Sequence, residues 1–113
     1  MSNNNENYFR NRQGAKVYYD YRLHDTLEIP DVKDTSEDGI VYDVLAVGFF
    51  GFLDKPHITI AIDGQAELFL LPDDLIGWVM HCMSVAQQGT NFFPEKVEFG
   101  YLLDADRIYA ELY

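Results

Sequence analysis

The pattern of apolar and polar positions along the chain is most helix-like between Pro72 and Gly89. Pro72 has a φ angle suited to a first helical turn, and Asp73 and Asp74 place negative charge at the positive end of the helix dipole. Gly89 suits the left-handed residue that ends many helices. The sequence therefore predicts a central helix at about residues 73–88.

Alternating apolar and polar positions predict strands on both sides of this helix. The predicted strands are residues 15–24, 40–53, 58–62, 66–70, 97–103 and 108–112. Their order along the chain is β-β-β-β-α-β-β, so we expect an α+β fold with an antiparallel sheet of five or six strands, packed on or wrapped around the helix. Residues 1–14 are expected to be a flexible N-terminal segment, and residues 15–113 a single α+β domain.

The hairpin around Asp63-Gly64 can be placed in register from its apolar positions. A two-residue turn would pair Ile60 with Glu67 and set an apolar side chain opposite a polar one. A three-residue loop over residues 62–64 pairs Ile60 with Ala66 instead. We therefore expect the three-residue loop.

The predicted helix is apolar around most of its circumference, and this bears on assembly. One flat sheet covers only one side of a helix, so a second cover is needed. We expect a homodimer through this helix or an obligate partner, with Trp78 or Met80 near the contact, and a strongly wrapped sheet is the alternative. Cys82 lies in the same helix pattern and is interpreted as a small buried hydrophobe, with a reactive thiol as the alternative.

Net charge adds the strongest constraint on partners. The 113 residues include 19 acidic and 8 basic side chains, which gives a formal net charge of −11. A field of this sign repels phosphate and anionic lipid, so we expect a basic protein surface as the partner, no direct nucleic-acid contact and no membrane contact. The chain shows no leader-like apolar region near Met1 and no long apolar run, so we expect a cytoplasmic protein. Solubility alone is the alternative explanation of the acidity.

The acidic residues concentrate in one predicted connection, from Asp25 to Asp38, which holds six acids and a single base, Lys33. Pro30 and the pair Asp38-Gly39 indicate that this connection is exposed. The first predicted strand adds polar positions on its exposed face. The candidate partner-binding residues are therefore Tyr18, Asp20, Asp25, Glu28, Asp31, Asp34, Glu37 and Asp38.

The sequence contains no strong catalytic, metal or cofactor motif. There is no Gly-x-Ser-x-Gly, no phosphate-binding glycine loop, and no HExxH or CxxC spacing. The acids of the predicted connection are spaced by three, which does not fit a calcium-binding loop. His81 and Cys82 are adjacent, so on a helix their side chains point about 100° apart and do not form a dyad. We therefore expect that the protein is not an enzyme and that it binds neither a metal nor a cofactor.

These observations favour a small acidic cytoplasmic interaction module. Our leading hypothesis is an inhibitor of the phage or plasmid type, which presents carboxylates where a basic partner would bind nucleic-acid phosphates. One alternative is a small-molecule or peptide binding module, with a pocket between sheet and helix lined by Trp78, His81 and Phe50. Another is a non-catalytic subunit of a larger assembly.

Overall fold

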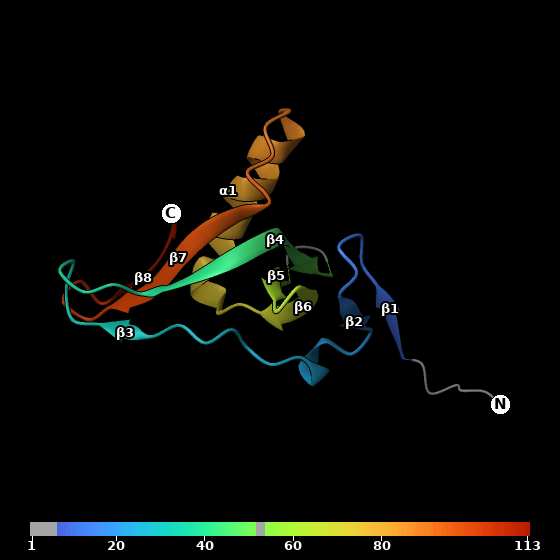
Figure 1. Ribbon diagram of the computed structural model, residues 1–113, viewed down its shortest axis with the longest axis horizontal. Coiled ribbons are helices and arrows are strands. Elements are labelled where there is room, and N and C mark those ends of the chain that lie inside the picture. Colours follow the sequence, from blue (N-terminus) through green and yellow to red (C-terminus); the bar gives the residue numbers. More distant parts are fainter. Residues whose placement is uncertain (1–6, 52–53) are drawn as a thin grey trace.

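One α-helix lies against a mixed six-stranded sheet, with a separate two-stranded sheet beside it, in a computed structural model that describes residues 7–51 and 54–113 (Figure 1). The strands are β1 (Tyr8–Arg10), β2 (Lys16–Tyr18), β3 (Asp31–Val32), β4 (Ile40–Phe50), β5 (Lys55–Ile62), β6 (Gln65–Leu70), β7 (Glu95–Leu102) and β8 (Arg107–Leu112). The helices are the 3-10 helices η1 (Tyr21–Leu23) and η2 (Asp73–Leu75), and α1 (Ile76–Gln87). The α+β class is confirmed, whereas the purely antiparallel sheet is wrong, because β3 runs parallel to β7.

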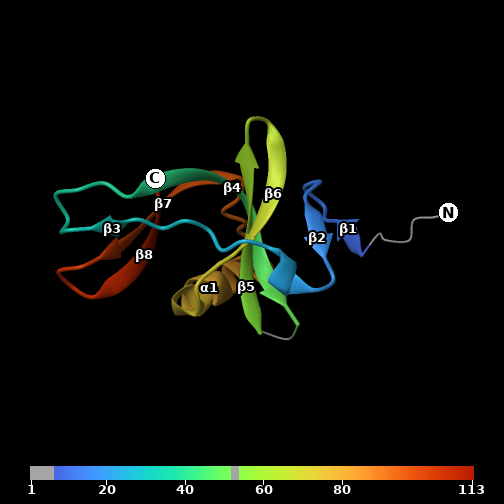
Figure 2. The ribbon, with the colours of Figure 1, turned by 90° about the horizontal axis from the view of Figure 1, so that it is seen from below.

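The long strand β4 joins two differently oriented parts of the sheet. Its residues 40–44 pair with β7, and its residues 43–50 pair with β5. A register shift between Val44 and Ala46 bends the strand where the two parts meet, as β-bulges do. The β5–β6 hairpin consequently stands across the direction of β7 and β8 (Figure 2). Strand β8 pairs with one edge of β7. Along the other edge of β7, β4 pairs with residues 95–99 and β3 pairs with residues 101–102.

The helix begins and ends close to the predicted positions. η2 forms its first turn, α1 continues to Gln87, and Gly89 ends it with a φ of +100°. The Gly89 N–H donates to the Ala86 carbonyl (3.0 Å) and the Thr90 N–H to the Val85 carbonyl (3.2 Å). This pair of bonds is the Schellman arrangement, which satisfies carbonyls that a helix end leaves free.

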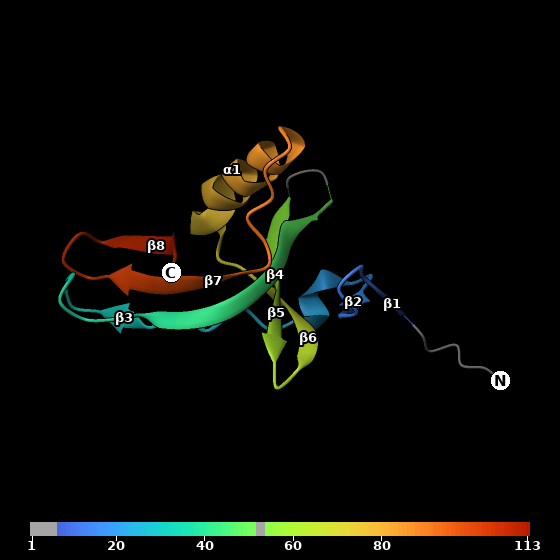
Figure 3. The ribbon, with the colours of Figure 1, turned by 45° about the horizontal axis from the view of Figure 1, so that its top comes forward.

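Only one face of the helix is buried. Leu75, Val79 and Cys82, spaced by four and three residues, are at most 4% exposed. Leu75 and Val79 pack with apolar side chains of the sheet, among them Val44, Ile58, Ile60, Val97 and Phe99. Figure 3 shows the helix on one side of the strands, so the sheet is packed on it and does not wrap around it. The opposite face carries Met80, which is 45% exposed.

The β5–β6 hairpin has a two-residue turn, so the predicted three-residue loop is wrong. Asp63 (φ +52°) and Gly64 (φ +83°) form the turn, and Ile60 pairs with Glu67. Two consecutive positive φ angles fit the type I′ turn that Asp-Gly favours. The one-residue difference moves Leu68 to the other face of the hairpin, where the N-terminal strands bury it. Both faces are covered, so apolar residues are needed on both.

The N-terminal region also differs from the predicted strand at residues 15–24. β2 ends at Tyr18, and the Asp20 carboxylate accepts the Arg22 N–H (3.1 Å) at the start of η1. Residues 7–14 were expected to be flexible, but they contain β1, which pairs antiparallel with β2. The remainder of that predicted segment, residues 1–6, lies outside the described residues.

The connection from Asp25 to Gly39 is exposed at most of its acidic positions and anchored at its apolar ones. Leu27 and Val32 are at most 4% exposed. The Leu27 N–H donates to the Leu70 carbonyl of β6 (2.8 Å), and further along the connection β3 pairs with the end of β7. The connection therefore runs from the edge strand β6 to the end of β7, and most of its carboxylates are exposed to solvent.

Candidate functional site

Several carboxylates lie where the β3–β4 and β7–β8 connections meet. β3 pairs with β7 there, and the Leu103 N–H donates to the Val32 carbonyl (2.9 Å), so the two connections are held side by side. We call this region the acidic end. It contains the carboxylates of Asp31, Asp34, Glu37, Asp38, Glu98, Asp104, Asp106 and Glu111, with only Lys33 and Arg107 of opposite charge.

Hydrogen bonds hold several of these carboxylates in place and in the ionised form. The Ser36 hydroxyl and N–H both donate to the Asp34 carboxylate, and they lower the pKa of Asp34. The Glu98 carboxylate accepts the Gly39 N–H (2.9 Å) and the Tyr109 hydroxyl (2.8 Å). These two donors, the backbone N–H first, lower the pKa of Glu98. The negative charge therefore persists at neutral pH.

The charge of the acidic end is not neutralised within the described chain. Ion pairs among the described residues join Asp20 to Arg22 (2.9 Å), Asp73 to Lys55 (3.1 Å) and Asp43 to Lys96 (2.6 Å). None of these ion pairs includes a carboxylate of the acidic end.

The acidic end also contains a hollow of about 270 Å³. It is lined by Thr35, Glu37, Asp38, Glu98, Leu102, Arg107, Tyr109 and Glu111. Such carboxylates can accept hydrogen bonds from lysine or arginine side chains of another molecule.

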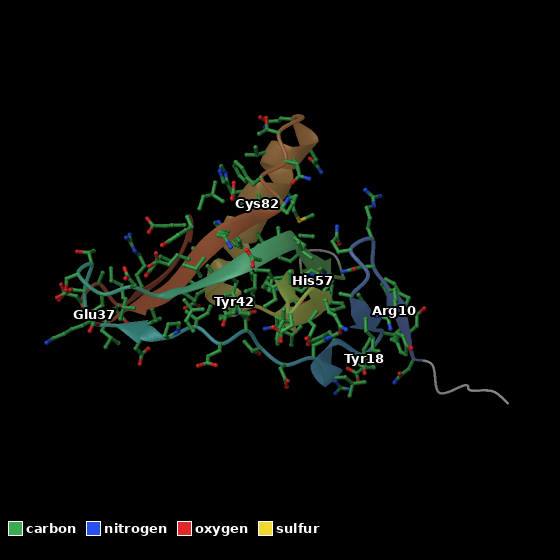
Figure 4. The ribbon with its side chains drawn as sticks, in the orientation of Figure 1. Arg10, Tyr18, Glu37, Tyr42, His57 and Cys82 are labelled. Carbon is green, nitrogen blue, oxygen red and sulfur yellow. The ribbon has the colours of Figure 1, made fainter. Side chains whose placement is uncertain are left out.

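The structure divides the predicted contact residues among three places. Asp31, Asp34, Glu37 and Asp38 belong to the acidic end. Asp25 and Glu28 border a groove of about 510 Å³ whose apolar lining includes Ile60, Ile62 and Phe69. Tyr18 and Asp20 lie beside the two-stranded sheet, where Asp20 is paired with Arg22. Figure 4 shows this separation, with Glu37 at one end of the molecule, Tyr42 between and Tyr18 toward the other end.

The sequence reasoning missed half of the acidic end, namely Glu98, Asp104, Asp106 and Glu111. These residues are far from the predicted connection in sequence and join it through the parallel pairing of β3 with β7. Asp104 and Asp106 lie in a recognisable hairpin loop, which is a local signal of exposure. No local signal shows that this loop lies beside residues 33–38.

The opposite end of the molecule carries positive charge, on the hairpin formed by β1, β2 and their connection, which we call the basic hairpin. Its cations are Arg10, Arg12 and Lys16. The Lys16 ammonium lies 4.5 Å from the ring centroid of Tyr8 and 5.8 Å from that of Tyr18, a cation–π arrangement. Arg10 is directly opposite Lys16 across the two strands. The sign of the charge thus reverses between the two ends (Figure 4).

Side chains, and not a continuous strand ladder, attach the basic hairpin to the main sheet. The Asn11 amide donates to the Thr59 hydroxyl (3.0 Å), and the Tyr18 N–H donates to Nε2 of His24 (3.0 Å). Ala15 and Val17 pack against Leu68 of β6. The hairpin is therefore a separate layer over the second face of β5 and β6.

Two histidines beneath this layer, His24 and His57, both lie close to Phe50. The Phe50 ring centroid is 5.8 Å from that of His24 and 4.7 Å from that of His57. Burial lowers the pKa of His57 to about 4, and burial also lowers the pKa of His24. A neutral His24 can accept the Tyr18 N–H at Nε2, so its neutral state and the docked hairpin are coupled.

The described structure places Trp78, His81 and Phe50, the residues of the alternative pocket, in different surroundings. Trp78 packs against Phe99 (5.6 Å between centroids), whereas Phe50 belongs to the separate cluster beneath the basic hairpin. His81 is exposed on α1. Cys82 of the same helix is buried, and burial raises the pKa of its thiol to about 11, so the interpretation as a buried hydrophobe fits.

No protein-family model matches this chain, and no curated protein or solved structure matches it either. Among residues 7–51 and 54–113, no group of three or more His, Cys, Asp or Glu side chains is placed to hold a metal ion. No helix in this part of the chain has both the length and the apolarity to cross a membrane. The fold and the charges therefore define the protein only as a small α+β protein with an acidic end and a basic hairpin.

Proposed function

We propose that this protein is a non-catalytic interaction module whose acidic end binds a basic surface of a partner protein. The observation that supports the proposal is the meeting of eight carboxylates from two connections and the strands beside them, with none of them in an ion pair within the described chain. Uncompensated like charges repel one another and do not stabilise a fold. A cationic partner would relieve this repulsion, which folding alone does not.

The proposed action is inhibition of a nucleic-acid-handling protein in the cytoplasm, as phage- or plasmid-type inhibitors would exert it. Carboxylates spread over two neighbouring connections would take the places of phosphates on the partner's basic surface. Long-range attraction would speed the encounter, and it would weaken as salt is added. Hydrogen bonds from arginine and lysine to fixed carboxylates, such as those of Asp34 and Glu98, would prolong the complex.

The test compares two variants with the same change in charge. The end variant replaces four exposed carboxylates that lack side-chain hydrogen bonds in the described structure: Asp31→Asn, Asp38→Asn, Asp104→Asn and Glu111→Gln. The control variant changes exposed carboxylates elsewhere: Asp25→Asn, Glu28→Gln, Asp54→Asn and Asp63→Asn. A partner captured from a nucleic-acid-rich lysate at low salt is purified, and its association with parent and variants is measured over a range of salt concentrations.

We expect the end variant to associate about tenfold more slowly at low salt and to show a flatter salt dependence. The control variant should stay close to the parent, and the free energy of unfolding of both should change by about 0.5 kcal/mol or less. Equal effects of the two variants would mean that total charge, and not the acidic end, attracts the partner. Unchanged binding by both would leave solubility as the explanation of the acidity.

The homodimer through α1 remains a second, weaker proposal about assembly. It is supported by Met80, which is 45% exposed on the face of the helix turned away from the sheet. Trp78, the other expected contact residue, already packs against Phe93 and Phe99 of its own chain. Light scattering at micromolar concentration tests the proposal, and a monomer there would remove it.

A further inference from the structure

A second open hollow lies at the opposite end from the acidic one, between the basic hairpin and the outer edge of β6. Its volume is about 450 Å³, within the range of small-molecule sites. It is lined by Arg10, Lys16, Tyr18, His24, Gln65, Ala66, Glu67 and Leu68. This is a cationic and aromatic lining in a chain whose net charge is −11.

Two cations on one wall of the hollow lie directly opposite each other, although like charges in that position repel. Arg10 and Lys16 are cross-strand neighbours, and neither is in an ion pair within the described chain. One Arg10 nitrogen, Nη1, donates to the Gly14 carbonyl (2.9 Å), which orients the guanidinium. The remaining guanidinium donors and the Lys16 ammonium can bind an anion with several oxygens, such as a phosphate.

Two rings form the next part of the lining. The Tyr18 and His24 ring centroids are 5.1 Å apart, and Nε2 of His24 accepts the Tyr18 N–H (3.0 Å). This hydrogen bond holds the His24 ring, which also lies against Phe50 (5.8 Å between the His24 and Phe50 centroids). Fixed aromatic rings beside cations are the pattern by which proteins bind a base and its phosphate.

The far wall is polar and includes a strand edge. The Leu70 N–H and carbonyl bond outward to Asp25 (2.9 Å) and Leu27 (2.8 Å), so alternation along β6 directs the backbone groups of Ala66 outward as well, toward the hollow. These outward backbone groups can exchange hydrogen bonds with the polar edge of a base.

We propose that this hollow binds a nucleoside phosphate, with the phosphate on Arg10 and Lys16 and the base against Tyr18 and His24. A free nucleotide and a nucleotide unit of a single strand share this chemistry. The site is separate from the acidic end and does not depend on the function proposed for it. Because salt screens the attraction between the phosphate and the two cations, binding should weaken as salt is added.

The test is an NMR titration of the full chain at low salt with GMP, UMP, inorganic phosphate and an eight-nucleotide guanine-containing single strand. We expect GMP to shift the amide signals of Tyr18, His24 and Ala66, and to bind more tightly than UMP because a purine has the larger face for stacking. Lys16→Gln and Arg10→Gln should each weaken GMP binding at least fivefold. Lys16→Arg should retain it, and Lys33→Gln at the acidic end is the matched charge control.

The two sources of the ligand are separated by the same titration. Tighter binding of the strand than of GMP assigns the site to single-stranded nucleic acid, and the opposite order assigns it to free nucleotide. Absence of shifts at these amides with millimolar GMP and with the strand would overturn the proposal. So would equal weakening by Lys33→Gln, or tighter binding at the same amides by a synthetic acidic peptide of residues 31–39, which would mark a protein-docking surface instead.

Discussion

The two ends of this protein are both built from hairpins, but they are attached to the main sheet in different ways. The acidic end continues the strand ladders of β3, β7 and β8 and is joined by backbone hydrogen bonds. The basic hairpin forms its own two-stranded sheet and is held by a few side chains, among them Asn11 and His24. Strand ladders are cooperative, whereas side-chain anchors can be lost one at a time. We therefore expect the acidic end to persist under conditions that release the basic hairpin.

This difference suits the opposite charges of the two ends. Eight carboxylates repel one another, so a rigid backbone is needed to keep them together. The basic hairpin has fewer like charges, and two of its cations, Arg10 and Lys16, lie over tyrosine rings. It needs less support from the rest of the fold.

The largest expected change in the free energy of unfolding comes from Gly39→Ala, which would disturb the contact between the acidic end and β7. A Cβ at this position would lie 2.0 Å from the carbonyl oxygen of Phe99 and 2.9 Å from the Tyr109 hydroxyl. The backbone of β4 would have to move away from β7, at a cost of about 3 kcal/mol in the free energy of unfolding. Urea unfolding measures this change.

The matched control for that variant is Gly77→Ala on the exposed side of α1, where an added Cβ meets no atom within 4 Å. Because alanine favours helix more than glycine does, this variant should gain about 0.5 to 1 kcal/mol. If Gly39→Ala were as stable as the parent, the close backbone approach would not be what holds the acidic end.

The next prediction concerns the dependence of stability on pH, which should differ between the acidic end and the basic hairpin. His57 has a folded-state pKa of about 4, below the ordinary value near 6.5, and the pKa of His24 is also lowered. Below pH 6.5 the unfolded chain therefore binds protons that the folded chain does not, so stability falls between pH 6.5 and 4. For His57 the loss is at most about 3 kcal/mol. Asp34 and Glu98 have lowered pKa values, so their contribution is lost only below about pH 4.5.

Amide protection measured by NMR between pH 7.5 and 3.5 tests this order of events. Residues 8–18 should lose protection before β7 and β8 do. His57→Gln should remove much of the loss above pH 4.5, and His81→Gln on the exposed face of α1 is the matched control. Simultaneous loss of protection at both ends would show that the basic hairpin unfolds only with the whole domain.

A smaller effect is expected from Asn11→Ala. The Asn11 carboxamide oxygen accepts the N–H groups of Gln13 (3.0 Å) and Ala15 (2.9 Å), and its nitrogen donates to Thr59 (3.0 Å). Thr59 is 1% exposed, so its hydroxyl would be left without this partner, at a cost of about 1 to 2 kcal/mol.

Hydrogen exchange should place this loss in residues 8–18 and spare the acidic end. Asn91→Ala, which removes one exposed hydrogen bond to Phe93 (3.1 Å), is the matched control. If hydrogen exchange in β7 and β8 accelerated as much as in the basic hairpin, the acidic end and the basic hairpin would unfold together as one cooperative unit.

The sequence by itself determined the features that depend on neighbouring residues. The helix from η2 to Gln87 follows from its local signals, Pro72, two aspartates and Gly89, each of which acts within one turn. Several strands follow from alternation, and the exposure of most acids between Asp25 and Asp38 follows from their charge. The net charge of −11 is likewise fixed by composition.

Only the tertiary structure decided which distant segments meet. Parallel pairing of β3 with β7 brings the β7–β8 connection beside the residues that follow β3, and no local pattern encodes a pairing between two residues of a connection and a distant strand. The register of the β5–β6 hairpin was also decided non-locally. The basic hairpin covers its second face, so Leu68 is buried there and the two-residue turn prevails over the register that one buried face would favour.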